Sequence, residues 1–187
     1  KMEAAIKWAQ PFLDETEYVG LDIETSNPPE SDDWLAEQNR KSDGDLGVDV
    51  IGSKLTGLSL TFGKNLQHTL YFPIDHADTL NCSSERLCEF IYSLGKPLII
   101  QNAAGFELPV LGQEWEEFTK AKGLPKFLPN ALDTRIEACY VNENIEHGLK
   151  QSSSFYLGYQ QVDYKPVTTV EVGKDEAGEP IMAQQKM

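Results

Sequence analysis

The segment Tyr18–Thr25 constrains the fold more than any other part of the sequence. It consists of residue types that favour β-strands, yet it carries two carboxylates, Asp22 and Glu24, two positions apart. Side chains alternate between the two faces of a strand, so these acids point the same way, with Cα atoms about 6.6 Å apart. Leu21 and Ile23 point the other way. The segment therefore predicts a strand with one apolar and one acidic face.

The spacing of Asp22 and Glu24 also bears on chemistry. Like charges that close repel each other and raise each other's pKa unless a cation lies between them. Carboxylate oxygens are hard ligands that suit Mg²⁺ or Mn²⁺. Because Asp-x-Glu is a common sequence, the pattern alone leaves two interpretations open, a divalent-metal site and the merely polar end of a strand.

The length and composition are those of one soluble domain. The 187 residues are enough for a sizeable core, and the longest apolar stretches, such as Pro97–Ile100, are far too short to cross a bilayer. Three cysteines, an odd number without a Cys-x-x-Cys spacing, favour reduced thiols over disulfides or zinc. We therefore expect a cytoplasmic protein without a membrane partner. Its start at Lys1, without a signal peptide, indicates a domain excised from something longer.

The charge of the chain argues against non-specific binding to nucleic acid. The formal net charge is −14, whereas affinity for phosphates normally comes from Lys and Arg. An acidic site can still hold a phosphodiester through metal ions, and a basic neighbouring domain can supply the remaining attraction. Any hypothesis of nucleic-acid binding therefore includes a partner domain.

Other common chemistries find little support in the sequence. The three histidines, His68, His76 and His147, are scattered without the spacing of a metal site or a catalytic triad. No Gly-rich loop of the P-loop or Rossmann type occurs. The acidic pair remains the strongest chemical signal.

Strand-like and helix-like periods alternate along the rest of the chain. The predicted elements are a helix over 4–12 that ends near Pro11, a hairpin of strands over 54–62 and 68–74, a helix over 84–94 capped by Ser84, a strand over 98–100, a helix that begins near Asp133, and a helix over 148–157 that Gly158 ends. Residues 30–47 are predicted to be a mobile loop and 162–187 a polar tail or hairpin. This order indicates an α/β fold.

Three segments, taken together, carry a resemblance to one family. They read YVGLDIETSN, LIIQNAAGFELPVL and ALDTRIEACYV followed by HGLKQSSSFYLGY. They resemble the proofreading 3′-to-5′ exonuclease domain of family A DNA polymerases, which belongs to the ribonuclease-H-like DEDD exonucleases. The resemblance spans nearly the whole chain and implies one exonuclease-like domain over 1–187. Its fold would be a mixed sheet, with three antiparallel strands and then parallel ones, flanked by helices.

The resemblance also implies an activity. A domain of this kind hydrolyses the 3′-terminal phosphodiester of single-stranded DNA with two Mg²⁺ or Mn²⁺ ions and releases nucleoside monophosphates. Its partners would be a single-stranded DNA 3′ end and a polymerase domain in the same or a partner chain. Its setting would be the cytoplasm of a bacterium or a phage-infected host.

The family's first motif, Asp-x-Glu-Thr, matches Asp22, Glu24 and Thr25. The resemblance implies that Asp22 bridges both metals, that Glu24 binds one metal and the attacking water, and that Thr25 contacts the terminal nucleotide. This agrees with the first of the two interpretations that the residues alone leave open, a divalent-metal site at Asp22 and Glu24.

The second motif, Asn-x-x-(Phe/Tyr)-Asp, is matched with two departures. Glu107 stands where the family has a metal-binding Asp, and Asn102 precedes it by five positions rather than four. Either Gly105 is an insertion or Ala103 takes the place of the Asn. The resemblance makes Glu107 a catalytic metal ligand and Asn102 and Phe106 substrate contacts. The alternatives are a solvated Glu107 in the first turn of a helix and a Phe106 that belongs to the core.

The third motif, Tyr-x-x-x-Asp on a late helix, is doubtful. Tyr159 and Asp163 match its letters, but they follow the predicted helix stop at Gly158, so their side chains need not converge. We expect the true motif to lie beyond Met187, and Asp133 to begin a helix rather than bind metal. Two rival interpretations remain open, a non-hydrolytic scaffold for a polymerase and a stand-alone RNA exonuclease.

Overall fold

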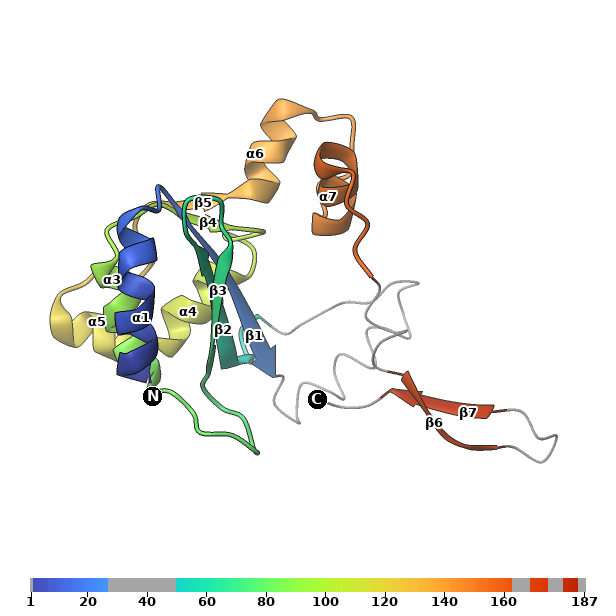
Figure 1. Cartoon of the computed structure of the whole chain (residues 1–187), viewed down its shortest axis with the longest axis horizontal. Helices are drawn as coiled ribbons and strands as arrows, with labels where there is room; N and C mark the ends of the chain where they lie inside the picture. Colours follow the sequence, from blue (N-terminus) through green and yellow to red (C-terminus); the bar gives the residue numbers. More distant parts are fainter. Residues whose placement is uncertain (1, 27–49, 163–168, 175–179, 185–187) are drawn as a thin grey trace. The chain divides into compact units, whose positions relative to one another are not determined.

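Strand β1 (Val19–Ser26) lies at the centre of a five-stranded sheet with the order β3-β2-β1-β4-β5 (Figure 1). The computed structural model describes residues 2–26, 50–162, 169–174 and 180–184, so the loop predicted over 30–47 lies outside the described residues. The chain forms two compact units, 1–141 and 142–187. The first unit contains the sheet and both acids of the Asp-x-Glu pair.

The first unit alternates strands and helices much as the sequence predicts. After β1 its strands are β2 (Lys54–Phe62), β3 (His68–Pro73), β4 (Leu98–Ile100) and β5 (Ala131–Asp133), and its helices are α1 (Met2–Asp14), α3 (Ser84–Ser93), α4 (Glu107–Glu114), α5 (Glu116–Lys122) and α6 (Thr134–Val141). Strands β1, β2 and β3 pair antiparallel, and β4 pairs parallel with both β1 and β5. The predicted mixed sheet is therefore confirmed.

One face of the sheet forms the core. Helices α1, α3, α4 and α5 lie on one side of the sheet in Figure 1. The buried apolar side chains include Leu21, Ile23, Leu58, Leu60, Phe62 and Phe72 from the strands and Leu13, Leu87, Ile91, Val110, Leu111 and Trp115 from the helices. Burying a side chain of this size contributes about 1.5–3 kcal/mol. The alternation along β1 thus fixes which face the helices cover.

Two predicted helix boundaries are wrong, and packing explains both. Helix α1 runs through Pro11 to Asp14, because its last turn places Leu13 in the core at 3% exposure. Helix α3 is capped by Ser83 instead of Ser84. The Ser84 hydroxyl accepts a hydrogen bond from Trp115 Nε1 at 2.9 Å and donates one to Glu114 Oε1 at 2.7 Å. Ser84 therefore ties α3 to α4 rather than capping α3.

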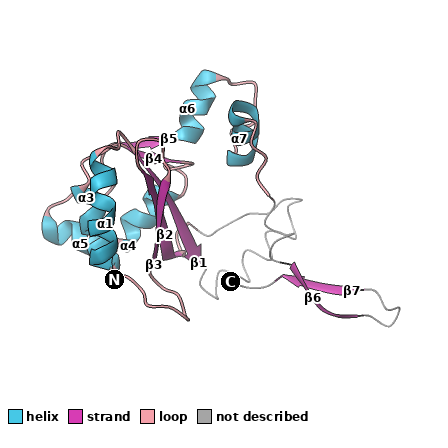
Figure 2. Ribbon diagram, in the orientation of Figure 1, coloured by secondary structure: helices cyan, strands magenta, loops and turns pink. Residues whose placement is uncertain are grey.

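The second unit contains helix α7 (Leu149–Leu157) and a two-stranded sheet of β6 (Thr169–Lys174) and β7 (Pro180–Gln184), shown in Figure 2. Gly158 ends α7 with φ +64, as its position in the sequence predicts. Strands β6 and β7 pair antiparallel within the segment expected to be a tail or hairpin. Among the described helices of both units, none is long and apolar enough to cross a membrane.

A buried hydroxyl joins α1 to the β2–β3 turn and gives a first prediction. Thr16 Oγ1 accepts a hydrogen bond from Gly63 N at 2.6 Å and donates one to Phe12 O at 2.8 Å. Thr16→Val would leave the Gly63 N–H buried without a partner, at a cost of about 1–3 kcal/mol. Thr16→Ser keeps the hydroxyl and is the matched control. Urea unfolding that gives both variants the same stability would contradict the prediction.

Candidate functional site

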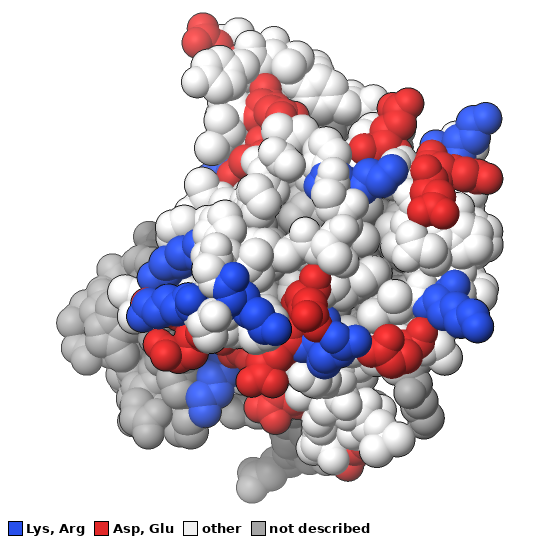
Figure 3. All heavy atoms as spheres, turned by 90° about the vertical axis from the view of Figure 1, so that its left-hand side faces the viewer, with Lys and Arg blue, Asp and Glu red and all other residues white. Residues whose placement is uncertain are grey.

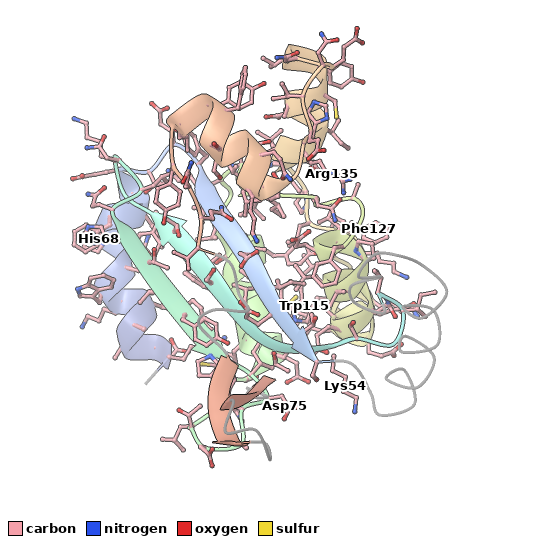
Figure 4. The ribbon with its side chains drawn as sticks, turned by 90° about the vertical axis from the view of Figure 1, so that its right-hand side faces the viewer. Lys54, His68, Asp75, Trp115, Phe127 and Arg135 are labelled. Atoms are coloured by element: carbon pink, nitrogen blue, oxygen red, sulfur yellow. The ribbon has the colours of Figure 1, made fainter. Side chains whose placement is uncertain are left out.

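Asp22 and Glu24 lie on the face of β1 opposite the core. Their side chains are exposed, whereas Leu21 and Ile23 between them are only 4% and 6% exposed. Figure 4 views the sheet from this open side. Local desolvation raises the pKa of both acids, and the charge of Asp22 raises that of Glu24 further. The pair therefore carries the mutual repulsion expected of carboxylates without a cation between them.

Glu107 is buried at the start of α4, which excludes the solvated alternative. It is 5% exposed, and its Oε2 atom is buried without a hydrogen-bond partner among the described residues. The pKa of Glu107 is raised to about 7, mainly by desolvation and to a smaller extent by the charges of Asp22 and Asp133, against a backbone hydrogen bond that lowers it. Glu107 thus lies within electrostatic range of Asp22. Buried carboxylate oxygens normally have a hydrogen-bond partner, so the unpartnered Oε2 of Glu107 is unusual.

The five-residue spacing from Asn102 to Glu107 is absorbed by a wide turn. Asn102 adopts a left-handed conformation with φ +61, and its carbonyl accepts hydrogen bonds from the N–H groups of Gly105 and Phe106. Leu108 N–H donates to Ala103 O, five residues earlier, at 2.9 Å. That is the hydrogen-bond spacing of a π turn, which accommodates one extra residue. The departure from the family spacing is therefore compatible with an intact strand-to-helix junction.

Asp133 holds this junction in place. Its Oδ1 accepts from Asn102 N at 3.0 Å and from Arg135 N at 2.9 Å, and its Oδ2 accepts from Ala104 N at 3.0 Å. Arg135 Nη1 also donates to the side chain of Asn102 at 2.9 Å. Asp133 lies at the start of α6, as predicted, and in addition binds the loop that leads to Glu107. The Asn102 side-chain oxygen is engaged by Arg135.

The remaining predicted site residues have mixed surroundings. Thr25 is half-buried and follows a register irregularity between it and Glu24. Phe106 is half-buried and packs against the hydrophobic core, which agrees with the alternative that it is a core residue. Tyr159 follows the end of α7 and is 61% exposed, while Asp163 lies outside the described residues. The described part of the third motif is thus not helical.

The acids of the described residues do not form a closed protein cage for a metal ion. Within residues 2–26 and 50–162, no three His, Cys, Asp or Glu side chains are grouped so as to hold a metal. Ion pairs between described residues involve Glu3 on α1, Arg86 and Glu89 on α3, and residues on and after α5, and none includes the three site acids. Figure 3 shows the mixed charges of the helix-covered side. Because Mg²⁺ is usually bound by one or two carboxylates plus phosphate oxygens, the orphaned Glu107 oxygen and the unpaired acids suit it.

Tyr71 and His76 lie near Glu24, and the sequence alone did not mark either as a candidate site residue. Tyr71 on β3 projects from the same open face, and its hydroxyl is 2.8 Å from His76 Nε2. The charge of Glu24 raises the pKa of Tyr71. The signal that could have found them is Gly57, which pairs with Glu24 across strands β1 and β2 and leaves room beside that acid.

Comparisons with known proteins establish the fold. No protein-family profile matches the chain, and a comparison with curated protein sequences finds no match. The RNase domain of the yeast Pop2 protein matches with a TM-score of 0.56 and 13% identity, over 86% of this chain and 74% of that one. A chain in the structure of the yeast NOT1 MIF4G domain co-crystallized with CAF1 matches with a TM-score of 0.53 and 11% identity, over 86% and 76%. The predicted ribonuclease-H-like fold is confirmed.

The raised pKa of Glu107 predicts a pH dependence of stability in metal-free protein. Between its ordinary value of 4.5 and about 7, the folded state keeps a proton that the unfolded state releases. The free energy of unfolding should therefore fall as pH rises through this window, by up to ~3 kcal/mol relative to Glu107→Gln. Chelated wild type and variant are compared by urea unfolding from pH 4 to 8. Parallel curves would contradict the raised pKa, and added Mg²⁺ should flatten the difference.

The hydrogen bonds of Asp133 give a second prediction for the site. Asp133→Ala removes the acceptor of the Asn102 and Ala104 N–H groups and should cost about 3 kcal/mol, because two bonds to a charged group are lost and the one from Asn102 is part-buried. Hydrogen exchange at these two amides should accelerate. Asp133→Asn, which keeps one carbonyl acceptor, should lose less protection. Unchanged exchange in the Ala variant would show that the junction holds without Asp133.

Proposed function

We propose that this chain is a metal-dependent 3′-to-5′ exonuclease, the proofreading domain of a family A DNA polymerase. One observation carries the proposal. Asp22, which shares the open face of β1 with Glu24, lies within electrostatic range of Glu107, a buried carboxylate with an unpartnered oxygen, in a fold shared with an RNase domain. An uncompensated acidic cluster costs stability, so its presence favours a function that needs a cation.

Three carboxylates would hold the ions. Asp22, Glu24 and Glu107 would bind two Mg²⁺ or Mn²⁺ ions. Asp22 would be the shared ligand, because its charge acts on both Glu24 and Glu107. When bound, such ions lower the pKa of an attacking water and offset the charge on the leaving 3′ oxygen. Exposed Glu24 would orient the water, and Thr25, next along β1, would contact the terminal nucleotide. Glu107 would bind most strongly above its pKa of about 7, where it is ionised.

The substrate would be the 3′ end of single-stranded DNA. Frayed or mismatched ends reach such a site more readily because their bases are already unstacked. With a net charge of −14 the chain attracts DNA poorly by itself, so a polymerase domain would deliver the strand. The acidic surface and the partner are thus two parts of one hypothesis.

Two other functions have specific support. RNA is an alternative substrate because the matched yeast Pop2 domain is an RNase. Discrimination between RNA and DNA depends on contacts to the 2′-hydroxyl, and the site residues named above do not select for or against that group. A non-hydrolytic scaffold is the other alternative. It is favoured by the lack, among the described residues, of three acids grouped closely enough to hold a metal.

Digestion of a 3′-end-labelled single strand separates these functions. The chain should release labelled mononucleotides with Mg²⁺ or Mn²⁺ and none with chelator, and Asp22→Ala should slow release by ~10³-fold, because metal stabilisation of the transition state amounts to several kcal/mol. Glu117→Ala, at an exposed acid of α5, is the matched control. DNA and RNA strands of one sequence are compared. Binding of the strand without metal-dependent cleavage would favour the scaffold function and contradict the exonuclease proposal.

A further inference from the structure

We propose that Tyr71, held by His76, is a substrate-positioning residue whose hydroxyl contacts the terminal phosphodiester group beside Glu24. This inference rests on the proposed function, because it names the contact that a nucleic-acid strand makes next to the acids. Neither residue belongs to the three motifs found in the sequence.

Gly57 creates the space that the Tyr71 side chain occupies. A Cβ atom built on Gly57 would lie 1.9 Å from the Tyr71 hydroxyl oxygen and 2.5 Å from Cζ. Real Cβ atoms never approach a neighbour that closely, so the tip of the ring fills the volume that any other residue would need. The open face of β2 thus has a hole at Gly57 that receives the hydroxyl of Tyr71.

The register of the sheet puts this hydroxyl next to Glu24. Gly57 is the direct cross-strand partner of Glu24, and Cβ atoms of such partners are about 4.5–5.5 Å apart on the same face. Because the Tyr71 hydroxyl takes the Cβ position of Gly57, it lies at about this distance from the Cβ of Glu24. The electrostatic influence of Glu24 on Tyr71, and of His76 on Glu24, agrees with this placement.

His76 fixes the direction of the hydroxyl and is itself fixed. The Tyr71 hydroxyl and His76 Nε2 are 2.8 Å apart, and their rings meet at 80° with centroids 5.7 Å apart. His76 N donates to Asn81 Oδ1 at 2.9 Å, and Asn81 Nδ2 donates back to His76 O at 3.0 Å. The pair is therefore held in place before any ligand arrives, which lowers the entropic cost of a contact.

The chemistry of this position suits a phosphate oxygen. Asp22 and Glu24 repel a phosphodiester, so the substrate needs hydrogen-bond donors on the same face that do not compete for the metal. Tyr71 is 44% exposed, and desolvation raises the pKa of its hydroxyl, which keeps it neutral. When the Nε2–H group of His76 donates to the Tyr71 oxygen, the hydroxyl hydrogen is free to donate to a phosphate oxygen. The purely structural alternative is that the ring only covers Gly57, a known way of stabilising a glycine in a sheet.

Tyr71→Phe distinguishes the two roles because it removes the hydroxyl and keeps the ring over Gly57. We expect affinity for a fluorescent single-stranded oligonucleotide with a free 3′ end, measured in Ca²⁺, to fall by ~10-fold, as for a lost hydrogen bond to a charged group. Metal-dependent release of the terminal nucleotide should fall by ~10- to 100-fold, and the unfolding midpoint should not change. Tyr18→Phe is the matched control, because Tyr18 is 43% exposed in the same unit. Equal affinity for wild type and Tyr71→Phe would overturn the inference.

A double-mutant cycle tests the part played by Gly57. Gly57→Ala should displace the Tyr71 ring and weaken oligonucleotide binding, but should have little further effect once Tyr71→Ala has removed the ring. Additive losses would count against the proposal. If the wild type binds but does not cleave while Tyr71→Phe still loses affinity, the inference survives and the exonuclease proposal fails. If the wild type cleaves and Tyr71→Phe matches it in both assays, the exonuclease proposal stands alone.

Discussion

The alternation of side chains along β1 is the constraint on which the rest of the first unit depends. Because β1 is paired on both edges, its register with β2 and β4 cannot slip without moving Leu21 and Ile23 out of the core. The same register holds Asp22 and Glu24 on the open face. The apolar half of the strand therefore supplies the packing energy that keeps two repelling carboxylates together.

Asp133 holds the loop that leads to the third acid. The parallel pairing of β4 with β5 brings the ends of both strands to one edge, where Asp133 binds the backbone of the loop that follows β4. That loop ends at Glu107. A carboxylate thus serves as a structural acceptor at one position while its charge raises the pKa of a second carboxylate nearby. The carboxylate of Asp133 thus has two effects, because its hydrogen bonds hold the loop and its charge adds to the desolvation that disfavours ionised Glu107.

Local patterns predicted the elements well, and tertiary contacts account for what they missed. The β2–β3 hairpin, β4 and the start of α6 at Asp133 follow from period-2 runs and capping residues. Ser84 has the right chemistry for a cap, but Trp115 and Glu114 engage its hydroxyl, which no local pattern reveals. Short β5 and α5 lack a periodic signal long enough to detect. The burial of Glu107 likewise depends on the core around α4.

The Tyr71 position shows why site residues are harder to predict than strands. Tyr71, Gly57 and Glu24 come from three strands, and they meet only because two successive registers place a hole in β2 between an aromatic ring and an acid. None of the three residues stands out within its own segment, and a glycine inside a strand usually destabilises that strand. Its conformational cost is offset when the space it leaves is filled by a side chain held from two sides. A strand glycine opposite an acidic residue thus indicates that a side chain from a neighbouring strand can lie beside that acid.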